Sequence, residues 1–315
     1  MTNITGFTFL STDGKTQLHG MRWEPEGRSV RAVLQICHGV AEHIARYDAF
    51  ARYLNELGIA VVGHDHLGHG RSLPEGGTPV YFGEGNTWHT VVDDIYVLHQ
   101  RIRLWYPDVP LCIMGHSMGS FLTRTYLIRY PGTVKAAIIM GTGFQPKALV
   151  KVAKTLCRVL AAFHGWHYRS SLVANLSFMG YNKGLEGRTT HDWLNRDQAE
   201  VDKYLAEERC TFTFTLNAYY SMFSGILRLH DPAFLARMPK ELPLLFLSGD
   251  ADPVGEQGKG VRRAIQSLKD AGVQNIESIF YPGARHELLV ETNKLEVFGD
   301  IAAWLDKPVS YTHLR

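Results

Sequence analysis

Short apolar segments alternate with longer amphipathic ones along much of this chain, and that alternation restricts the folds it can adopt. Four segments have the character of buried strands, at residues 32–37, 59–63, 111–114 and 134–140. The segments between them, at 47–57, 91–106 and 118–130, have the apolar spacing of helices. Such alternation is typical of strand-helix-strand units built around a parallel sheet whose two faces are both covered.

The same pattern begins and ends the chain. Residues 7–10 and 18–23 flank a Thr12-Asp13-Gly14 turn and predict an antiparallel hairpin that leads into the sheet. After residue 240, strands are expected at 244–248 and 276–281, and helices at 259–271 and 294–305. We therefore expect an α/β core, with a mostly parallel central sheet flanked by helices, made of residues 1–144 and 236–307. Residues 308–315 follow an expected helix end at Asp306 and are predicted to be a tail.

Residues 145–235 lack the strand pattern and are helical, aromatic and irregular. Because both flanks belong to one sheet pattern, we predict a helical cap (lid) over one end of the sheet rather than an independent helical domain. Its aromatic residues either wall an acyl channel or simply pack together. Tyr219, Tyr220 and Phe223 are the candidates for substrate contacts.

Charge and cysteine usage exclude several classes of protein. Thirty-three Lys and Arg against 31 Asp and Glu give a formal charge of +2, so no nucleic-acid partner is expected. The four cysteines have no C-x-x-C spacing, which is typical of reduced thiols in a cytoplasmic protein. The first 14 residues lack the features of a secretory signal, and no apolar run approaches the roughly 18 residues of a membrane span.

The segment Gly115-His116-Ser117-Met118-Gly119 lies directly between a predicted buried strand and a predicted helix. In that position a G-x-S-x-G segment is a tight turn, and its glycines leave room for it to lift the serine hydroxyl from the carboxyl edge of the sheet. A serine hydroxyl is a weak nucleophile unless an imidazole accepts its proton and a carboxylate orients that imidazole. Ser117 is the predicted nucleophile.

The partners of this serine should follow it in the order acid, then histidine, each in a loop after a strand. The loop after the last predicted strand offers His286 as the base. The loop before it offers two acids. Asp250 lies nearer the strand end, whereas Asp252 precedes Pro253 in a turn. We assign the acid to Asp252 and a turn-capping role to Asp250.

Two backbone N–H groups are expected to stabilise the negative charge on the substrate oxygen. The N–H of Met118 lies on the first turn of the helix after Ser117, at its positive end. The N–H of Val40 lies in the loop after strand 32–37, where Gly39 leaves room for the backbone. These two groups form the predicted oxyanion hole.

Residues 64–70 hold three histidines and Asp65, which raises the question of a metal site. The segment lacks the HxHxDH order of metallo-hydrolases, and no distant second group of ligands is evident. Asp65, Gly68, Gly70 and Ser72 instead fit a structural loop after strand 59–63. No metal and no cofactor are expected.

Taken together, these residues resemble the α/β-hydrolase superfamily, and more narrowly its monoacylglycerol lipase and lysophospholipase-like branch, often called serine aminopeptidase S33 or hydrolase-4. HGVAEHIARYDAFARYLNELGIAVVGHDHLGHGRS is similar to that branch's HG-x-x-EH to GHG-x-S stretch, and GHSMGS to its nucleophile elbow. The resemblance covers nearly the whole chain except the cap, which selects substrates in the family and has no alignable counterpart here. It implies a triad of Ser117, Asp252 and His286.

The resemblance also implies an activity: hydrolysis of monoacylglycerol, lysophospholipid or similar apolar acyl esters through an acyl-enzyme. The expected partner is a small acyl ester, and the cap is a candidate for transient contact with a membrane surface. An aminopeptidase of the iminopeptidase type would need cap acids for a free amine, for which Glu207 and Glu208 are available. Acyl transfer to an alcohol, and a non-catalytic ligand receptor on the same fold, are also compatible with these residues. Dehalogenases and epoxide hydrolases of this fold use an aspartate nucleophile, so Ser117 argues against them.

Overall fold

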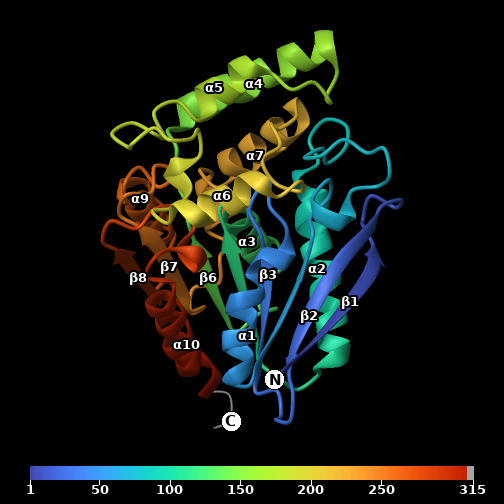
Figure 1. Cartoon of the computed structure of the whole chain (residues 1–315), viewed down its shortest axis with the longest axis vertical. Helices are drawn as coiled ribbons and strands as arrows, with labels where there is room; N and C mark the ends of the chain where they lie inside the picture. The colour runs from blue at the N-terminus through green and yellow to red at the C-terminus, as the bar shows by residue number, and fades with distance from the viewer. Residues whose placement is uncertain (311–315) are drawn as a thin grey trace.

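The computed structural model describes residues 1–310, which form an eight-stranded sheet with helices on both faces (Figure 1). The strands lie in the order β1-β2-β4-β3-β5-β6-β7-β8. All neighbours from β4 to β8 are parallel, while β2 runs antiparallel to β1 and β4. Their bounds are β1 Thr2–Leu10, β2 Gln17–Pro25, β3 Ala32–Cys37, β4 Ile59–His64, β5 Leu111–His116, β6 Ala136–Met140, β7 Leu244–Gly249 and β8 Ile276–Tyr281.

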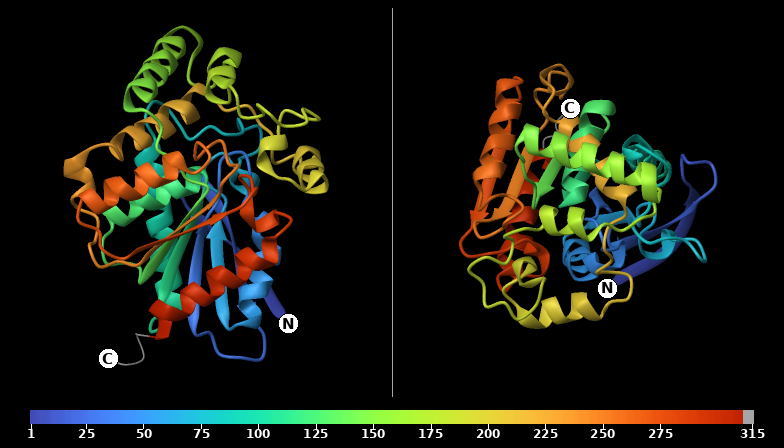
Figure 2. Two further views of the ribbon diagram at one scale, coloured as in Figure 1. Left: turned by 90° about the vertical axis from the view of Figure 1, so that its left-hand side faces the viewer. Right: turned by 90° about the horizontal axis from the view of Figure 1, so that it is seen from above.

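The two faces of the sheet bury different helices because successive strand residues point to opposite sides. On β3, Leu34 and Ile36 join the core under α1 and α10, whereas Val33 and Cys37 join the core under α2, α3 and α9. Figure 2 shows the sheet between these layers. The helices are α1 Asp48–Glu56, α2 Trp88–Trp105, α3 Met118–Arg129, α9 Lys259–Asp270 and α10 Lys294–Ser310.

The register of the parallel strands brings their carboxyl ends to one edge. Cys37 of β3 is paired with Gly115 of β5, and His116 of β5 with Met140 of β6. Loops that follow these strands therefore meet at the same edge. Short 3-10 helices occur in or near this region, at η1 Ile44–Tyr47, η2 Gly70–Ser72, η3 Asp192–Leu194 and η4 Leu288–Val290.

Residues 145–235, called the cap below, lie between β6 and β7 and contain only helices and loops. In Figure 1 they stand above the sheet, at the end opposite the N-terminus. The central helix α7 packs on α2 and α3, and α4 packs on α7. The cap helices are α4 Lys147–His164, α5 Ser171–Ser177, α6 Gln198–Ala206, α7 Leu216–Arg228 and α8 Pro232–Leu235.

The expected α/β architecture is confirmed, and the differences lie at element ends. The first strand begins at Thr2 rather than at residue 7, and α2 begins at Trp88. The predicted helix end at Asp306 is wrong, because α10 continues to Ser310. Pro308 hid this continuation, since proline usually interrupts a helix. The remaining residues of the predicted tail, 311–315, lie outside the described part of the chain.

Two further findings concern the cysteines and the apolar character of the helices. All four cysteines are buried and free of disulfide bonds, as their spacing predicts. Among the described residues, no helix combines the length and apolar character needed to cross a membrane.

Candidate active site

Ser117 joins β5 to α3 in a backbone conformation that few residues other than glycine adopt. Its φ is 53° and its ψ is −120°, and its N–H donates to the carbonyl of Met140 over 3.0 Å. The flanking glycines make this turn possible. A Cβ at Gly119 would collide with the carbonyl oxygen of Cys37, and one at Gly115 would collide with the first turn of α3. Strain at one non-glycine residue, supported by its surroundings, is typical of a functional position.

His286 is paired with Asp252. The ring Nδ1 lies 2.9 Å from Asp252 Oδ2, and the other carboxylate oxygen accepts the N–H of Val254 over 2.9 Å. Both side chains are buried, at 2% and 0% exposure. Asp250, by contrast, is exposed, and its carboxylate accepts the N–H of Gly283 over 2.6 Å. Of the two acids in this loop, the structure therefore places Asp252 beside the histidine.

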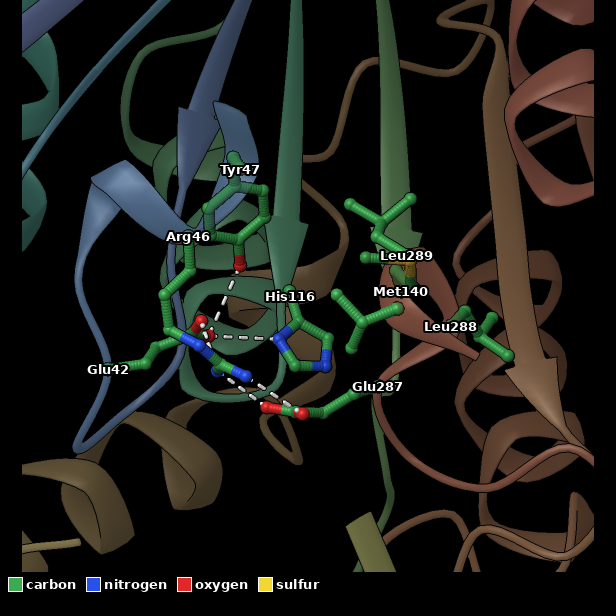
Figure 3. A pocket seen from close by; sticks show the side chains of 9 residues that line it. Glu42, Arg46, Tyr47, His116, Met140, Glu287, Leu288 and Leu289 are labelled. Atoms are coloured by element: carbon green, nitrogen blue, oxygen red, sulfur yellow. Dashed lines mark hydrogen bonds and ion pairs between the residues drawn. The ribbon is translucent and has the colours of Figure 1, made fainter. Parts of the chain in front are cut away.

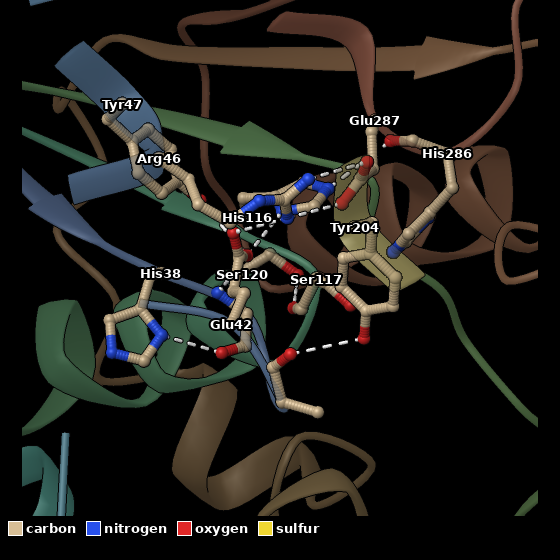
Figure 4. A network of polar contacts seen from close by, with 12 residues as sticks. His38, Glu42, Arg46, Tyr47, His116, Ser117, Ser120, Tyr204, His286 and Glu287 are labelled. Carbon is tan, nitrogen blue, oxygen red and sulfur yellow. Dashed lines mark hydrogen bonds and ion pairs between the residues drawn. The ribbon is translucent and has the colours of Figure 1, made fainter. Parts of the chain in front are cut away.

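The loop after β3 passes close to the serine. A Cβ built on Gly39 would lie only 3.0 Å from the Cβ of Ser117. The backbone of this loop therefore packs directly against the serine, with no room for a side chain at Gly39. Figure 4 shows Ser117 and His286 extending from separate loops toward the same region. No hydrogen bond joins their side chains within residues 1–310; such contacts are often long before a substrate binds.

Of the two backbone groups expected to form the oxyanion hole, one directly follows Ser117 in sequence, and the other follows Gly39 in the loop that passes the serine. Met118 is the first residue of α3, so its N–H has no partner within the helix. Val40 is half-buried in the loop after β3. Neither N–H donates a hydrogen bond within the described residues. Both therefore remain able to bind an oxygen atom, although their role stays a prediction.

A buried group of charged residues lies behind the serine, and sequence reasoning did not identify it (Figures 3 and 4). Glu42 accepts hydrogen bonds from His116 Nδ1 over 3.0 Å and from Tyr47 over 3.2 Å. Arg46 lies 3.2 Å from Glu42 and makes a two-point ion pair of 2.6 and 3.0 Å with Glu287. Glu42 belongs to the HG-x-x-EH stretch quoted above, and this motif is the sequence feature from which its role could have been predicted. Met140 and residues 288–290 complete the small pocket in Figure 3.

Electrostatics fix the charges in this group. Burial opposes ionisation of Glu42, yet the hydrogen bond and charge of His116, with the charge of Arg46, hold its pKa well below its usual range. Burial also opposes protonation of His116, and Glu42 outweighs it, so the pKa of His116 is raised. Glu42 is thus ionised, and His116 is more easily protonated than an ordinary histidine.

Residues 64–70 form a loop held by its own polar groups. The Asp65 carboxylate accepts the N–H groups of Ile44 and Arg71, each over 2.8 Å. His64 and His66 are fully buried, and their rings have no hydrogen-bond partner among the residues that the structure describes. Within residues 1–310, no three His, Cys, Asp or Glu side chains are arranged to hold a metal ion.

The cap candidates lie in different settings. Tyr219 is fully buried and Phe223 is 8% exposed, and both belong to the core cluster shared with α2 and α3. Tyr220 is half-buried and packs against Trp166, with ring centroids 5.0 Å apart. Packing thus accounts for Tyr219 and Phe223, and contact with a substrate stays a prediction for all three. Glu207 is engaged by Arg209 at 2.8 and 3.1 Å.

Comparison with known proteins places these features in a family context. The model of the family described as serine aminopeptidase, S33 matches residues 28–293. The monoglyceride lipase of Mus musculus is 30% identical over 294 residues, which cover 91% of this chain and 86% of the mouse protein. The monoacylglycerol lipase of Mycolicibacterium smegmatis is 28% identical over 305 residues, covering 90% of each chain. The crystal structure of a thermostable carboxyl esterase from Bacillus coagulans, in complex with glycerol, matches with a TM-score of 0.86, 26% identity and coverage of 97% and 99%.

Proposed function

Since this chain belongs to the serine aminopeptidase S33 family and has the α/β-hydrolase fold, we propose that it hydrolyses monoacylglycerols or similar apolar acyl esters through Ser117. The broader assignment to ester hydrolases of the esterase and lipase type follows from its relatives. The observation that carries the finer proposal is the strained Ser117 turn at the same sheet edge as the buried His286–Asp252 pair.

The proposed reaction uses these groups in two half-reactions. His286 accepts the Ser117 proton as the oxygen attacks the ester carbonyl, and the N–H groups of Val40 and Met118 donate to the resulting oxyanion. The C–O bond to the alcohol then breaks, and His286 protonates the leaving oxygen. In the second half-reaction, water loses a proton to His286 and attacks the acyl carbon. The bond from that carbon to the Ser117 oxygen then breaks, the fatty acid leaves, and His286 returns the proton to Ser117. Asp252 orients the imidazole throughout.

Glycerol monoesters are the substrate class that the relatives favour. The mouse and mycobacterial relatives are named for this activity, and the Bacillus coagulans esterase was crystallised with glycerol. Lysophospholipids share the same acyl-ester bond with a larger head group. An aminopeptidase activity has weaker support, because Arg209 already neutralises Glu207 and Glu208 is exposed.

The decisive experiment is a set of hydrolysis rates for p-nitrophenyl esters from acetate to palmitate, beside a monoacylglycerol and an aminoacyl amide. Each CH₂ buried in an acyl channel contributes about 0.8 kcal/mol, so kcat/KM should rise several-fold per carbon until the channel is full. A fluorophosphonate should label Ser117, and EDTA should leave the rates unchanged. Rates that are highest for acetate and decline with length would contradict the lipid-ester assignment, and a faster amide would favour the peptidase.

We also propose that the cap touches membrane surfaces transiently. The outer sides of α4 and α5 expose apolar side chains to solvent, with Phe163 at 80% and Val152 at 66% exposure. Lys147, Lys151 and Arg158 lie exposed on the same helix α4. The apolar set is Leu149, Val152, Val159, Phe163, Leu172 and Leu176. Exposed apolar side chains beside cations are suited to an anionic lipid surface.

Co-sedimentation with vesicles that contain anionic lipid tests this contact. Phe163→Ser should reduce the bound fraction several-fold, because it removes a large apolar side chain from the contact. Leu104→Ser is the matched control, since Leu104 is 82% exposed but lies on α2 of the core. Equal binding of the two variants and the wild type would contradict the assignment of the contact to the cap.

A further inference from the structure

The loop that carries Val40 is held on both sides of that residue. On its N-terminal side, the N–H of Gly39 donates to Glu42 Oε1 over 2.5 Å. On its C-terminal side, the hydroxyl of Tyr204 donates to the carbonyl of Ala41 over 3.1 Å. The first contact comes from the core, whereas Tyr204 belongs to the cap helix α6. The peptide that presents the Val40 N–H thus lies between a core contact and a cap contact.

Ala41 has a backbone conformation that needs support. Its φ is 56°, in the left-handed region, which costs a residue with a side chain roughly 1–2 kcal/mol. Relaxation of Ala41 to a negative φ would relieve that cost. Such a change would rotate the neighbouring peptides and move the N–H of Val40. The hydrogen bond from Tyr204 opposes this relaxation.

Tyr204 is itself firmly placed. It is 7% exposed, and the Arg46 guanidinium lies 4.9 Å from its ring centroid (Figure 4). Arg46 in turn pairs with Glu287, the residue after His286. Burial raises the pKa of Tyr204, so its hydroxyl stays protonated and able to donate.

We propose that Tyr204 is a positioning residue: its hydroxyl holds the Ala41 carbonyl so that the Val40 N–H faces the reacting oxygen, which links the oxyanion hole to the seating of the cap. The inference rests on the proposed function, because it takes Val40 as an oxyanion donor. Its consequence is that displacement of α6 would release the loop. Transition-state stabilisation would then be lost while Ser117, His286 and Asp252 keep their places.

Tyr204→Phe is the direct test, because it keeps the ring over Arg46 and removes only the hydroxyl. Loss of a whole oxyanion donor costs about 10²–10³ in kcat, and a displaced donor should cost less, about tenfold. We expect that fall in kcat for p-nitrophenyl butyrate with KM changed less than twofold. Affinity for an alkyl boronic acid, whose tetrahedral serine adduct places an oxygen in the oxyanion hole, should fall by a similar factor.

Tyr168→Phe is the matched control, since Tyr168 is an exposed cap tyrosine whose hydroxyl makes no hydrogen bond within residues 1–310. It should match the wild type in kcat and in boronic acid affinity. A general loss of structure in Tyr204→Phe would instead lower the melting temperature and raise KM. Wild-type kcat and boronic acid affinity in Tyr204→Phe would overturn the inference.

The double variant Tyr204→Phe/Ala41→Gly provides a second test. Glycine adopts positive φ without the cost that alanine has, so kcat of the double variant should be at least threefold higher than that of Tyr204→Phe. No recovery would contradict the role assigned to the Ala41 conformation. Failure of the proposed function is distinguishable, because the wild type would then hydrolyse no acyl ester or would resist fluorophosphonate, whereas failure of the inference alone leaves a labelled wild type that hydrolyses p-nitrophenyl butyrate.

Discussion

Ser117 and His286 act as one unit in the proposed reaction, because neither the attack nor the proton transfer proceeds without the other. Ser117→Ala and His286→Ala should each lower kcat by several orders of magnitude. The double variant should be no slower than the worse single variant, since the residual rate comes from binding and the oxyanion hole. Steady-state kinetics with circular dichroism as a folding control checks this. Substantial turnover by Ser117→Ala would contradict the assignment of the nucleophile.

Asp250 and Asp252 lie in the same loop, so equivalent substitutions of the two carboxylates can be compared directly. Asp252→Asn keeps the size of the side chain but offers His286 the wrong hydrogen-bonding partner, so kcat should fall by about 10⁴. Asp250→Asn, on an exposed carboxylate that accepts the N–H of Gly283, should change kcat less than a few-fold. The ratio of the two kcat values is the measurement, and a reversed ranking would transfer the acid role to Asp250.

At the scale of elements, the position of Ser117 depends on how closely α3 approaches the sheet. Gly119 faces the backbone of β3, where a Cβ would collide with the carbonyl of Cys37. Gly119→Ala must therefore push α3 away from the sheet and should destabilise the fold by about 3 kcal/mol. It should also lower kcat, because Ser117 and Met118 move with the helix.

Gly299 in α10 is the matched helical control. A Cβ there would meet only the Tyr53 hydroxyl at 3.9 Å, an ordinary contact. Alanine favours a helix interior over glycine by about 0.5–1 kcal/mol, so Gly299→Ala should stabilise slightly. Urea unfolding of both variants compares them. Equal stability of Gly119→Ala and the wild type would contradict the close packing of α3.

At the scale of the whole molecule, buried histidines make the fold sensitive to acid. Burial lowers the pKa of His64 to about 3, and lowers those of His69 and His99 to about 4. Below the ordinary value of 6.5 the unfolded chain binds these protons while the folded chain does not. The free energy of unfolding therefore decreases as pH falls from 6.5 toward the pKa of each histidine in the folded state. Each histidine contributes a loss of about 1.4 kcal/mol per pH unit over that range. Burial raises the pKa of Asp65 to about 6, which partly offsets this loss.

His64→Leu isolates one of these contributions, because the His64 ring is fully buried and has no hydrogen-bond partner in the described part of the chain. The free energy of unfolding at pH 8 should change by no more than about 1 kcal/mol, since a neutral ring is replaced by an apolar side chain. Between pH 6 and 4, the loss of stability should be shallower than in the wild type by about 1.4 kcal/mol per pH unit. Urea unfolding across this range measures it. Parallel curves would contradict the buried neutral state of His64.

Local patterns in the sequence were enough to predict the strands, the helices of the α/β core and the turn at Ser117, whereas the cap was predicted only as a helical segment. Branched apolar runs specify strands buried on both faces, and the two glycines around Ser117 specify the tight turn to α3. The sequence also predicted His286 as the base and Asp252 as the acid, with Asp250 as the neighbouring alternative. The end of α10 was mistaken because Pro308 is a local signal that the packed helix overrides.

Which distant residues meet was settled by tertiary packing. The fold placed Asp252 rather than Asp250 on His286, and it paired Arg46 with Glu287 across 241 positions of sequence. It brought Tyr204 to the carbonyl of Ala41, 163 positions away. Hydrophobic periodicity reports which face of an element is buried, but not which charged or hydroxyl group will face it from another element. Those contacts depend on strand order and on the seating of the cap, which no local pattern in this sequence encodes.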